Sequence, residues 1–96
     1  MIQAIYVHNN GFDTVVVRDG TALMVTREVV QHFLEAQHNG DDFSEWHGTM
    51  DWPTDLHDIW EVAEAFGDVV AYYEDGRLHV QNAKLWEERK TFWGVA

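Results

Sequence analysis

Six histidines and 17 carboxylates in a chain of 96 residues are the side chains best suited to metal chemistry. Glu28, His32 and Glu35 have the spacing i, i+4 and i+7, which places them on one helix face as a carboxylate–imidazole patch. That face lies opposite the apolar residues of the same segment, whereas a metal enzyme holds its ligands in a shaped, dry cavity. The H-E-x-x-H pattern is also absent. We therefore predict no metal site.

Acid–base and nucleophilic catalysis have equally little support. His57 and Asp58 are neighbours, and the segment Glu45–His47 also holds a carboxylate and an imidazole, but adjacent helix residues do not face each other. The single serine, Ser44, lacks the glycine elbow of a nucleophile, and there is no cysteine. The seven glycines are isolated, so no phosphate-binding loop is present. We predict that the protein is not an enzyme and requires no cofactor.

The charge is the strongest feature of the composition. The 17 acidic residues and six Lys and Arg residues give a net charge of −11. No Lys or Arg lies between Arg27 and Arg77, and the 49 intervening positions hold 13 of the acids. Such a surface repels phosphate backbones and anionic membranes, so we expect no direct contact with nucleic acid or membrane. A basic protein is the expected partner, and a face that only keeps the protein soluble is the alternative.

The elements that position these residues follow from hydrophobic periodicity and turn residues. Asn9-Asn10-Gly11 and Asp19-Gly20 are hairpin signals between apolar runs, and Asp75-Gly76 is a third. We predict strands at residues 2–8, 12–18, 21–25, 69–73 and 77–81, helices at 27–39, 54–66 and 83–90, an irregular loop at 41–53, and a final strand or packed tail at 91–96.

The predicted fold class is α+β, in a single globular domain over residues 1–96. An antiparallel β-sheet, formed by the meander and a C-terminal hairpin, is covered on one face by two α-helices. The helices at 27–39 and 54–66 each carry an apolar stripe, with Thr26 and Thr54 as candidate N-caps. The helical core residues are predicted to be Val29, Val30, Phe33, Leu34, Leu56, Ile59, Trp60, Ala63 and Phe66, with Trp86 from the third helix.

The predicted working surface combines the long loop with the polar face of the helix that follows it. A loop of about 13 residues is long for a compact domain and is often functional. Its tryptophans can anchor an interface whose carboxylates pair with Arg and Lys, or can fold under to complete a thin core. The candidate partner-binding residues are Asp41, Asp42, Glu45, Trp46, Asp51, Trp52, Asp58, Glu61 and Glu64.

In size, charge and lack of cysteine, the chain is similar to small acidic α+β inhibitors encoded by phages and mobile elements. That group includes antirestriction proteins, anti-CRISPR proteins and a uracil-glycosylase inhibitor. The similarity implies a DNA mimic that occupies the basic nucleic-acid-binding surface of a host nuclease or DNA-processing complex.

Two further hypotheses stay open. The same composition is typical of a cytoplasmic immunity protein that neutralises a basic nuclease toxin. A small enzyme or ligand-binding domain with a His/carboxylate site would need a pocket with convergent polar groups. The N-terminus has no basic region or cleavage site, and no apolar run approaches the roughly 18 residues of a membrane span, so we expect a cytoplasmic protein. A homodimer is compatible with these properties.

Overall fold

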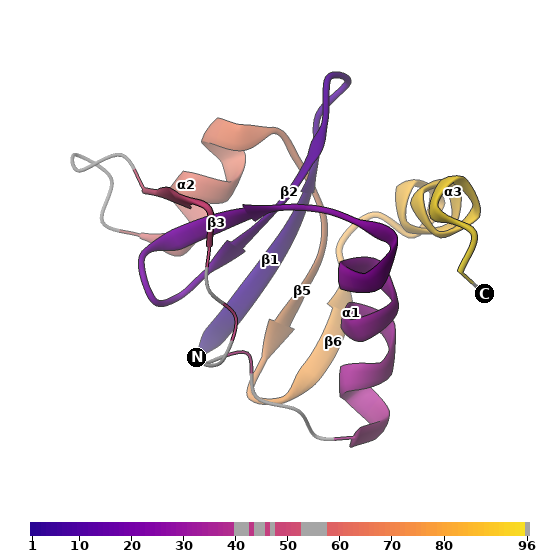
Figure 1. Cartoon of the computed structure of the whole chain (residues 1–96). Coiled ribbons are helices and arrows are strands. Elements are labelled where there is room, and N and C mark those ends of the chain that lie inside the picture. Colours follow the sequence, from indigo (N-terminus) through magenta and orange to yellow (C-terminus); the bar gives the residue numbers. More distant parts are fainter. Residues whose placement is uncertain (40–42, 44–45, 47, 53–57, 96) are drawn as a thin grey trace.

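The protein is built around a six-stranded antiparallel sheet with the strand order β4-β3-β2-β1-β5-β6 (Figure 1). The computed structural model describes residues 1–39, 43, 46, 48–52 and 58–95, with residues 37–39 described by their backbone alone. The elements are β1 (Ile2–His8), β2 (Asp13–Val17), β3 (Thr21–Met24), α1 (Arg27–Asn39), β4 (Met50–Asp51), α2 (Ile59–Phe66), β5 (Asp68–Glu74), β6 (Arg77–Val80) and α3 (Ala83–Trp93).

The central strand, β1, is buried on both faces. It pairs with β2 and β5, and every residue from Ala4 to Val7 has no exposed surface. Because successive side chains of a strand point to opposite faces, Tyr6 enters one apolar cluster and Ile5 the other. A strand that is apolar on both sides requires a covering layer on each face of the sheet.

The helices supply these two layers. Val30 and Phe33 of α1 and Trp86 of α3 belong to the cluster that contains Tyr6. Ile59, Val62 and Ala63 of α2 belong to the opposite cluster, with Ile5. The predicted class is therefore confirmed: the chain is α+β, and two helices, α1 and α3, cover one face of the antiparallel sheet. The helix that we predicted at 54–66 packs instead on the other face.

The α1 face has an aromatic core centred on Phe33. Its ring lies 4.8 Å from that of Tyr73 and 5.9 Å from that of Tyr6, both nearly perpendicular to it. Such edge-to-face pairs add to the energy of burying apolar area. The predicted burial of Phe33, Val30, Ile59, Ala63 and Trp86 is confirmed. The predicted core residues that are only partly buried are Val29, Leu34, Trp60 and Phe66, and Leu56 lies outside the described residues.

Three boundary predictions were wrong. The helix predicted from residue 54 begins at Ile59, because Asp58 is extended and caps it by accepting a hydrogen bond from the Trp60 backbone N–H; Thr54 lies outside the described residues. The third helix continues to Trp93, where Gly94 ends it in the left-handed conformation. Of the two alternatives for 91–96, the described residues form no strand, whereas Trp93 and Val95 pack against the core. The loop predicted at 41–53 contains the short strand β4, which pairs with β3.

Candidate functional site

The outward face of α2 carries carboxylates that form no ion pair with any other residue that the structure describes. Glu61 and Glu64 are exposed on the helix, and Asp58 is exposed at its N-cap. Asp68 is exposed just beyond the C-terminal end of α2, at the start of β5. None of the ion pairs between described residues includes any of these four. This set of four residues is called the α2 acidic face below.

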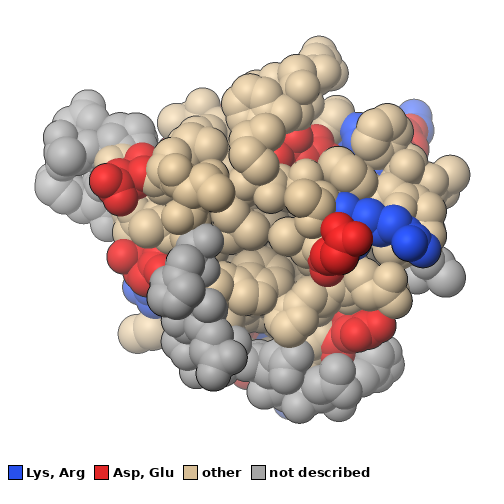
Figure 2. Space-filling model, in the orientation of Figure 1, with Lys and Arg blue, Asp and Glu red and all other residues tan. Residues whose placement is uncertain are grey.

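The sheet separates Asp58, Glu61 and Glu64 from most of the cations. Arg27 lies on α1, and Lys84, Arg89 and Lys90 lie on α3, so these four bases belong to the opposite layer. Figure 2 shows the largest area of Lys and Arg atoms on the side of the molecule where Figure 1 places α3. The layer formed by α1 and α3 also contains the acidic residues Glu28, Glu35, Glu87 and Glu88, so the positive and negative charges of that layer are balanced. The helix α2, in contrast, carries no Lys or Arg.

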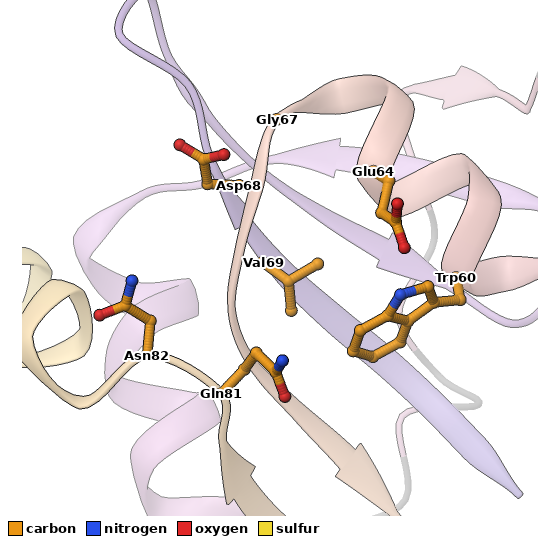
Figure 3. A pocket seen from close by; sticks show the side chains of 7 residues that line it. All are labelled: Trp60, Glu64, Gly67, Asp68, Val69, Gln81 and Asn82. Carbon is orange, nitrogen blue, oxygen red and sulfur yellow. The ribbon is translucent and has the colours of Figure 1, made fainter.

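A groove of about 490 Å³ lies at the C-terminal end of α2 (Figure 3). Trp60 and Glu64 border it from the helix, and Asp68 borders it from the start of β5. Gly67 lets α2 turn tightly into β5, since a Cβ there would lie 2.4 Å from the His8 carbonyl oxygen. The groove is therefore bordered by an indole and two carboxylates, and Figure 3 shows Glu64 on the same side of β5 as Trp60 and Asp68 on the other side. Its remaining lining residues are Val69, Gln81 and Asn82.

The two tryptophans predicted as anchors are partly buried and contribute to packing. Trp46 contacts the rings of Phe43 and His32, at centroid distances of 4.5 and 4.9 Å. Trp52 packs against the α2 cluster and donates its indole N–H to the Thr21 carbonyl oxygen at 2.9 Å. The partner-binding role predicted for them stays untested. Of the other predicted site residues, Asp51, Asp58, Glu61 and Glu64 are exposed, whereas Asp41, Asp42 and Glu45 lie outside the described residues.

The carboxylate–imidazole patch predicted on α1 is not a separate exposed cluster. His32 is half-buried because its ring packs against Phe43 and Trp46, which follow α1 in the chain, while Glu28 and Glu35 are exposed. Within the described part of the chain, no group of three His, Asp or Glu side chains is arranged to hold a metal ion.

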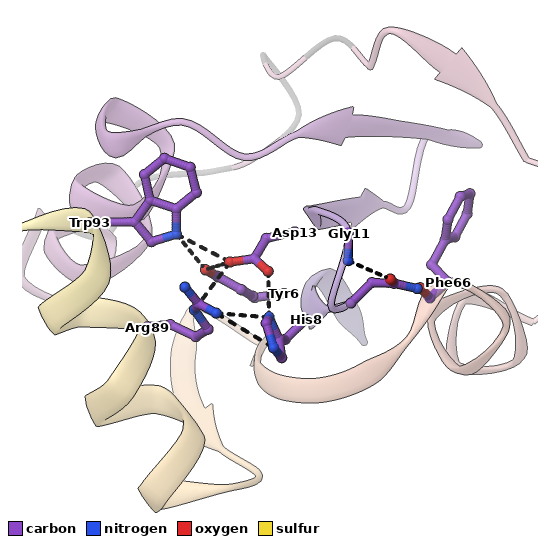
Figure 4. A network of polar contacts seen from close by, with 8 residues as sticks. Tyr6, His8, Gly11, Asp13, Phe66, Arg89 and Trp93 are labelled. Carbon is purple, nitrogen blue, oxygen red and sulfur yellow. Dashed lines mark hydrogen bonds and ion pairs between the residues drawn. The ribbon is translucent and has the colours of Figure 1, made fainter.

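A buried polar cluster around Asp13 was not predicted from the sequence (Figure 4). The Asp13 side chain is 4% exposed. Its Oδ2 accepts hydrogen bonds from the Tyr6 hydroxyl at 2.6 Å and the Trp93 indole N–H at 3.1 Å. Its Oδ1 lies 2.6 Å from Nδ1 of His8, and Nε of Arg89 lies 3.4 Å from Oδ2. These five residues are called the Asp13 cluster below.

The Asp13 cluster shifts the pKa values of two of its members. Burial alone would raise the pKa of Asp13, but hydrogen bonds from Tyr6, His8 and Trp93 and the charge of Arg89 outweigh it and lower that pKa. Burial raises the pKa of the Tyr6 hydroxyl well above its ordinary value, and the hydrogen bond to the Asp13 carboxylate raises it further. Asp13 is therefore the ionised acceptor of the cluster and Tyr6 a neutral donor.

One sequence signal pointed to this cluster. Asp13 shares its face of β2 with Val15 and Val17, both of which are buried. A carboxylate at an inward position needs hydrogen-bonding partners. The sequence could not identify those partners, because Arg89 and Trp93 lie at the far end of the chain.

Comparison with known protein families, curated proteins and solved structures gives no match to this chain. The fold and the surfaces described above are therefore the basis for assigning a function. None of the helices in the described residues is long and apolar enough to cross a membrane.

Proposed function

We propose that this protein is an acidic inhibitor that binds a basic protein through the α2 acidic face and occupies a surface that the partner uses for nucleic acid. The observation that carries the proposal is the charge of Asp58, Glu61 and Glu64, which form no ion pair with a described residue and from which the sheet separates most of the bases. Complementary potentials of this kind steer association and select partners.

The spacing of the carboxylates supports mimicry of a phosphate array. Glu61 and Glu64 are three residues apart on α2, a rise of about 4.5 Å, and one DNA strand carries a phosphate every 3.4 Å or so of axial rise. Asp58 adds a carboxylate at the N-cap of the helix. Ile59, Val62 and Ala63 hold α2 against the sheet, so the carboxylates stand on a rigid support.

The groove at the end of α2 adds a feature that suits an arginine side chain of the partner. A guanidinium can stack on the Trp60 indole while pairing with Glu64, which borders the groove from the same helix. The partial negative charge at the C-terminus of a helix favours a cation in the same place. A basic nucleic-acid-binding surface is rich in arginine, so the groove and the acidic face favour the same kind of partner.

The test is charge reversal on α2 with a matched reversal on the opposite layer. The variant Glu61→Lys/Glu64→Lys changes two exposed residues and leaves the Asp58 cap intact. The control Glu35→Lys/Glu88→Lys makes the same change of net charge at exposed positions on α1 and α3. The unchanged protein, called the parent, is used to capture binding proteins from a lysate of the source cells, and these are purified. Their rates of association with the parent, the α2 variant and the control variant are then measured at low and high salt.

We expect the α2 variant to associate about tenfold or more slowly than the control variant, with the difference shrinking at high salt. An excess of duplex DNA should displace the parent protein from its partner. Equal rates for the two variants would mean that the acidic face only solvates the protein. Binding that depends on α2 but resists DNA competition would favour the immunity-protein hypothesis, in which the inhibitor need not cover the nucleic-acid site.

A further inference from the structure

A second cavity, of about 310 Å³, opens beside the Asp13 cluster on a different part of the molecule. Its floor includes His8, Asp13 and Arg89, and its wall includes Trp93. The turn between β1 and β2 forms another side, and its residues Asn9, Asn10 and Gly11 line the cavity. The volume lies at the lower end of the range for small-molecule sites, which combine apolar walls with a few convergent polar groups.

The rim of this cavity is unusually apolar for an exposed surface. Phe12 and Met24 are each 44% exposed and Phe92 is 68% exposed, and all three line the cavity. Of the described residues, only Met1 and Val80 are other large hydrophobic side chains with comparable exposure. Single exposed hydrophobic residues are ordinary, but several that converge on one cavity mark a binding site.

The hydrogen bonds of the floor determine which chemistry a ligand must offer. Both carboxylate oxygens of Asp13 already accept hydrogen bonds or pair with a cation, so the carboxylate has little acceptor capacity left. The Trp93 indole N–H is shared between Tyr6 and Asp13, which uses the one donor of that side chain. Asp13 and Trp93 therefore do not require a hydrogen-bond donor on the ligand.

Arg89, in contrast, keeps unused donors. Its Nε faces Asp13, and its Nη1 lies 3.1 and 3.4 Å from the two ring nitrogens of His8. Among the residues that the structure describes, Nη2 has no partner, and Nε makes no hydrogen bond of good geometry. A guanidinium carries five N–H donors in a planar fork that matches a carboxylate. The group that best completes the floor is therefore a hydrogen-bond acceptor that matches the planar guanidinium, such as a carboxylate.

We propose that this cavity binds a small carboxylate with an apolar body, with the carboxylate on Arg89 and the body between Phe12, Met24 and Phe92. The guanidinium of Arg89 already stacks on the Phe92 ring, 4.4 Å from its centroid, so the cation and the apolar rim form one surface. The same chemistry occurs in a free aromatic acid and in a chain that ends in an apolar residue. The site is separate from the α2 acidic face and does not depend on the proposed inhibitor function.

The experiment is an NMR titration of the whole protein with phenylacetate and with phenylacetamide, which differ in charge but have nearly the same shape. We expect phenylacetate to shift the Gly11 amide and the Trp93 indole signals and to bind about fivefold or more tightly than the amide. N-acetylphenylalanine, added separately, distinguishes the sources: tighter binding than phenylacetate assigns the site to a chain end, and equal or weaker binding assigns it to a free acid.

Two variants of the cavity and one control variant outside it decide whether the cavity is responsible. Phe12→Ala/Phe92→Ala removes two exposed rim side chains and should weaken phenylacetate binding about tenfold, whereas Val80→Ala, an exposed apolar residue outside the cavity, should leave it unchanged. Arg89→Lys keeps the positive charge but removes the planar pair of guanidinium N–H donors. It should therefore reduce the preference for the acid over the amide. Equal binding of acid and amide by the parent, or unchanged binding by the rim variant, would overturn the proposal whether or not the Arg89 variant folds.

Discussion

Asp13 allows a quantitative test of the buried polar cluster. In Asp13→Ala the Tyr6 hydroxyl, the Trp93 indole and the Arg89 guanidinium all lose their shared acceptor. Removing one partner of a buried ion pair typically costs about 3–5 kcal/mol, because the remaining charge stays buried without compensation. A domain of this size has a free energy of unfolding of only about 5–15 kcal/mol, so this single substitution removes a large part of it.

The assay is urea unfolding at pH 7, followed by tryptophan fluorescence. We expect Asp13→Ala to lose about 3–5 kcal/mol, and Asp13→Asn to lose about 2 kcal/mol because its amide keeps one acceptor oxygen. Asp19→Ala provides a baseline for the loss of an exposed acid, because the hydrogen bonds that Asp19 accepts from described residues come from Thr21. A loss below about 1 kcal/mol for Asp13→Ala would show that water or a rearranged Arg89 replaces the carboxylate without cost, and would refute the reasoning.

The pH dependence gives an independent check with a definite sign. The pKa of Asp13 is lower in the folded protein than its ordinary value, so its stabilising effect is fully present above the unfolded pKa of about 3.9. The effect is lost as the pH falls below that value toward the folded pKa. The difference in stability between the parent and Asp13→Asn should therefore be constant above about pH 5 and shrink below pH 4. Asp75, whose pKa is also lowered, by the N-terminal amine, is common to both proteins and cancels in the difference.

Two further predictions test the packing that supports the surfaces. Gly67→Ala should destabilise the protein by about 2–3 kcal/mol, because the new Cβ would lie 2.4 Å from the His8 carbonyl oxygen; Gly11→Ala, with its nearest atom at 3.6 Å, should change stability by less than about 0.5 kcal/mol in the same urea assay. Phe33→Ala should lower the unfolding free energy by about 3–5 kcal/mol because the ring has no exposed surface, whereas Phe92→Ala should lower it by about 1 kcal/mol at most. Similar losses for the two members of either pair would contradict the packing described here.

Local chemistry made part of the fold predictable. The Asp75-Gly76 turn has positive φ at both residues, 54° and 78°, as a two-residue hairpin requires, so the sequence signal and the backbone agree. The apolar period of residues 27–39 predicted α1 with its observed boundaries. In both cases the deciding interactions lie within a few residues of each other along the chain.

The placement of α2 depended on longer-range packing. The run from Ala4 to Val7 is apolar at every position, which is typical of a strand covered on both faces, yet it does not say which helix covers which face. The start of α2 was misplaced because Thr54 is also a favourable N-cap residue and the apolar stripe extends back to Leu56. The cap is instead Asp58, which lies before the helix and accepts from the Trp60 N–H.

The candidate site could be predicted only as a set of charges. Exposed acids such as Glu61 and Glu64 were identified, since they lie opposite an apolar stripe. Their separation from the basic residues could not be predicted, because it depends on the fold placing α3 across the sheet from α2. The same is true of the Asp13 cluster, whose contacts from Arg89 and Trp93 span 76 and 80 residues of chain.

The central strand connects the two surfaces and also makes them separable. Ile5 and Val7 of β1 support α2, while Tyr6 and His8, on the alternate positions, support the Asp13 cluster. A change on the outward side of α2, such as Glu61→Lys/Glu64→Lys, contacts neither Tyr6 nor Asp13 and should leave carboxylate binding at Arg89 intact. A rim change such as Phe92→Ala alters no residue of the α2 acidic face. If each variant affects only its own ligand, the sheet separates two independent binding surfaces; if either affects both, the two faces are coupled through β1.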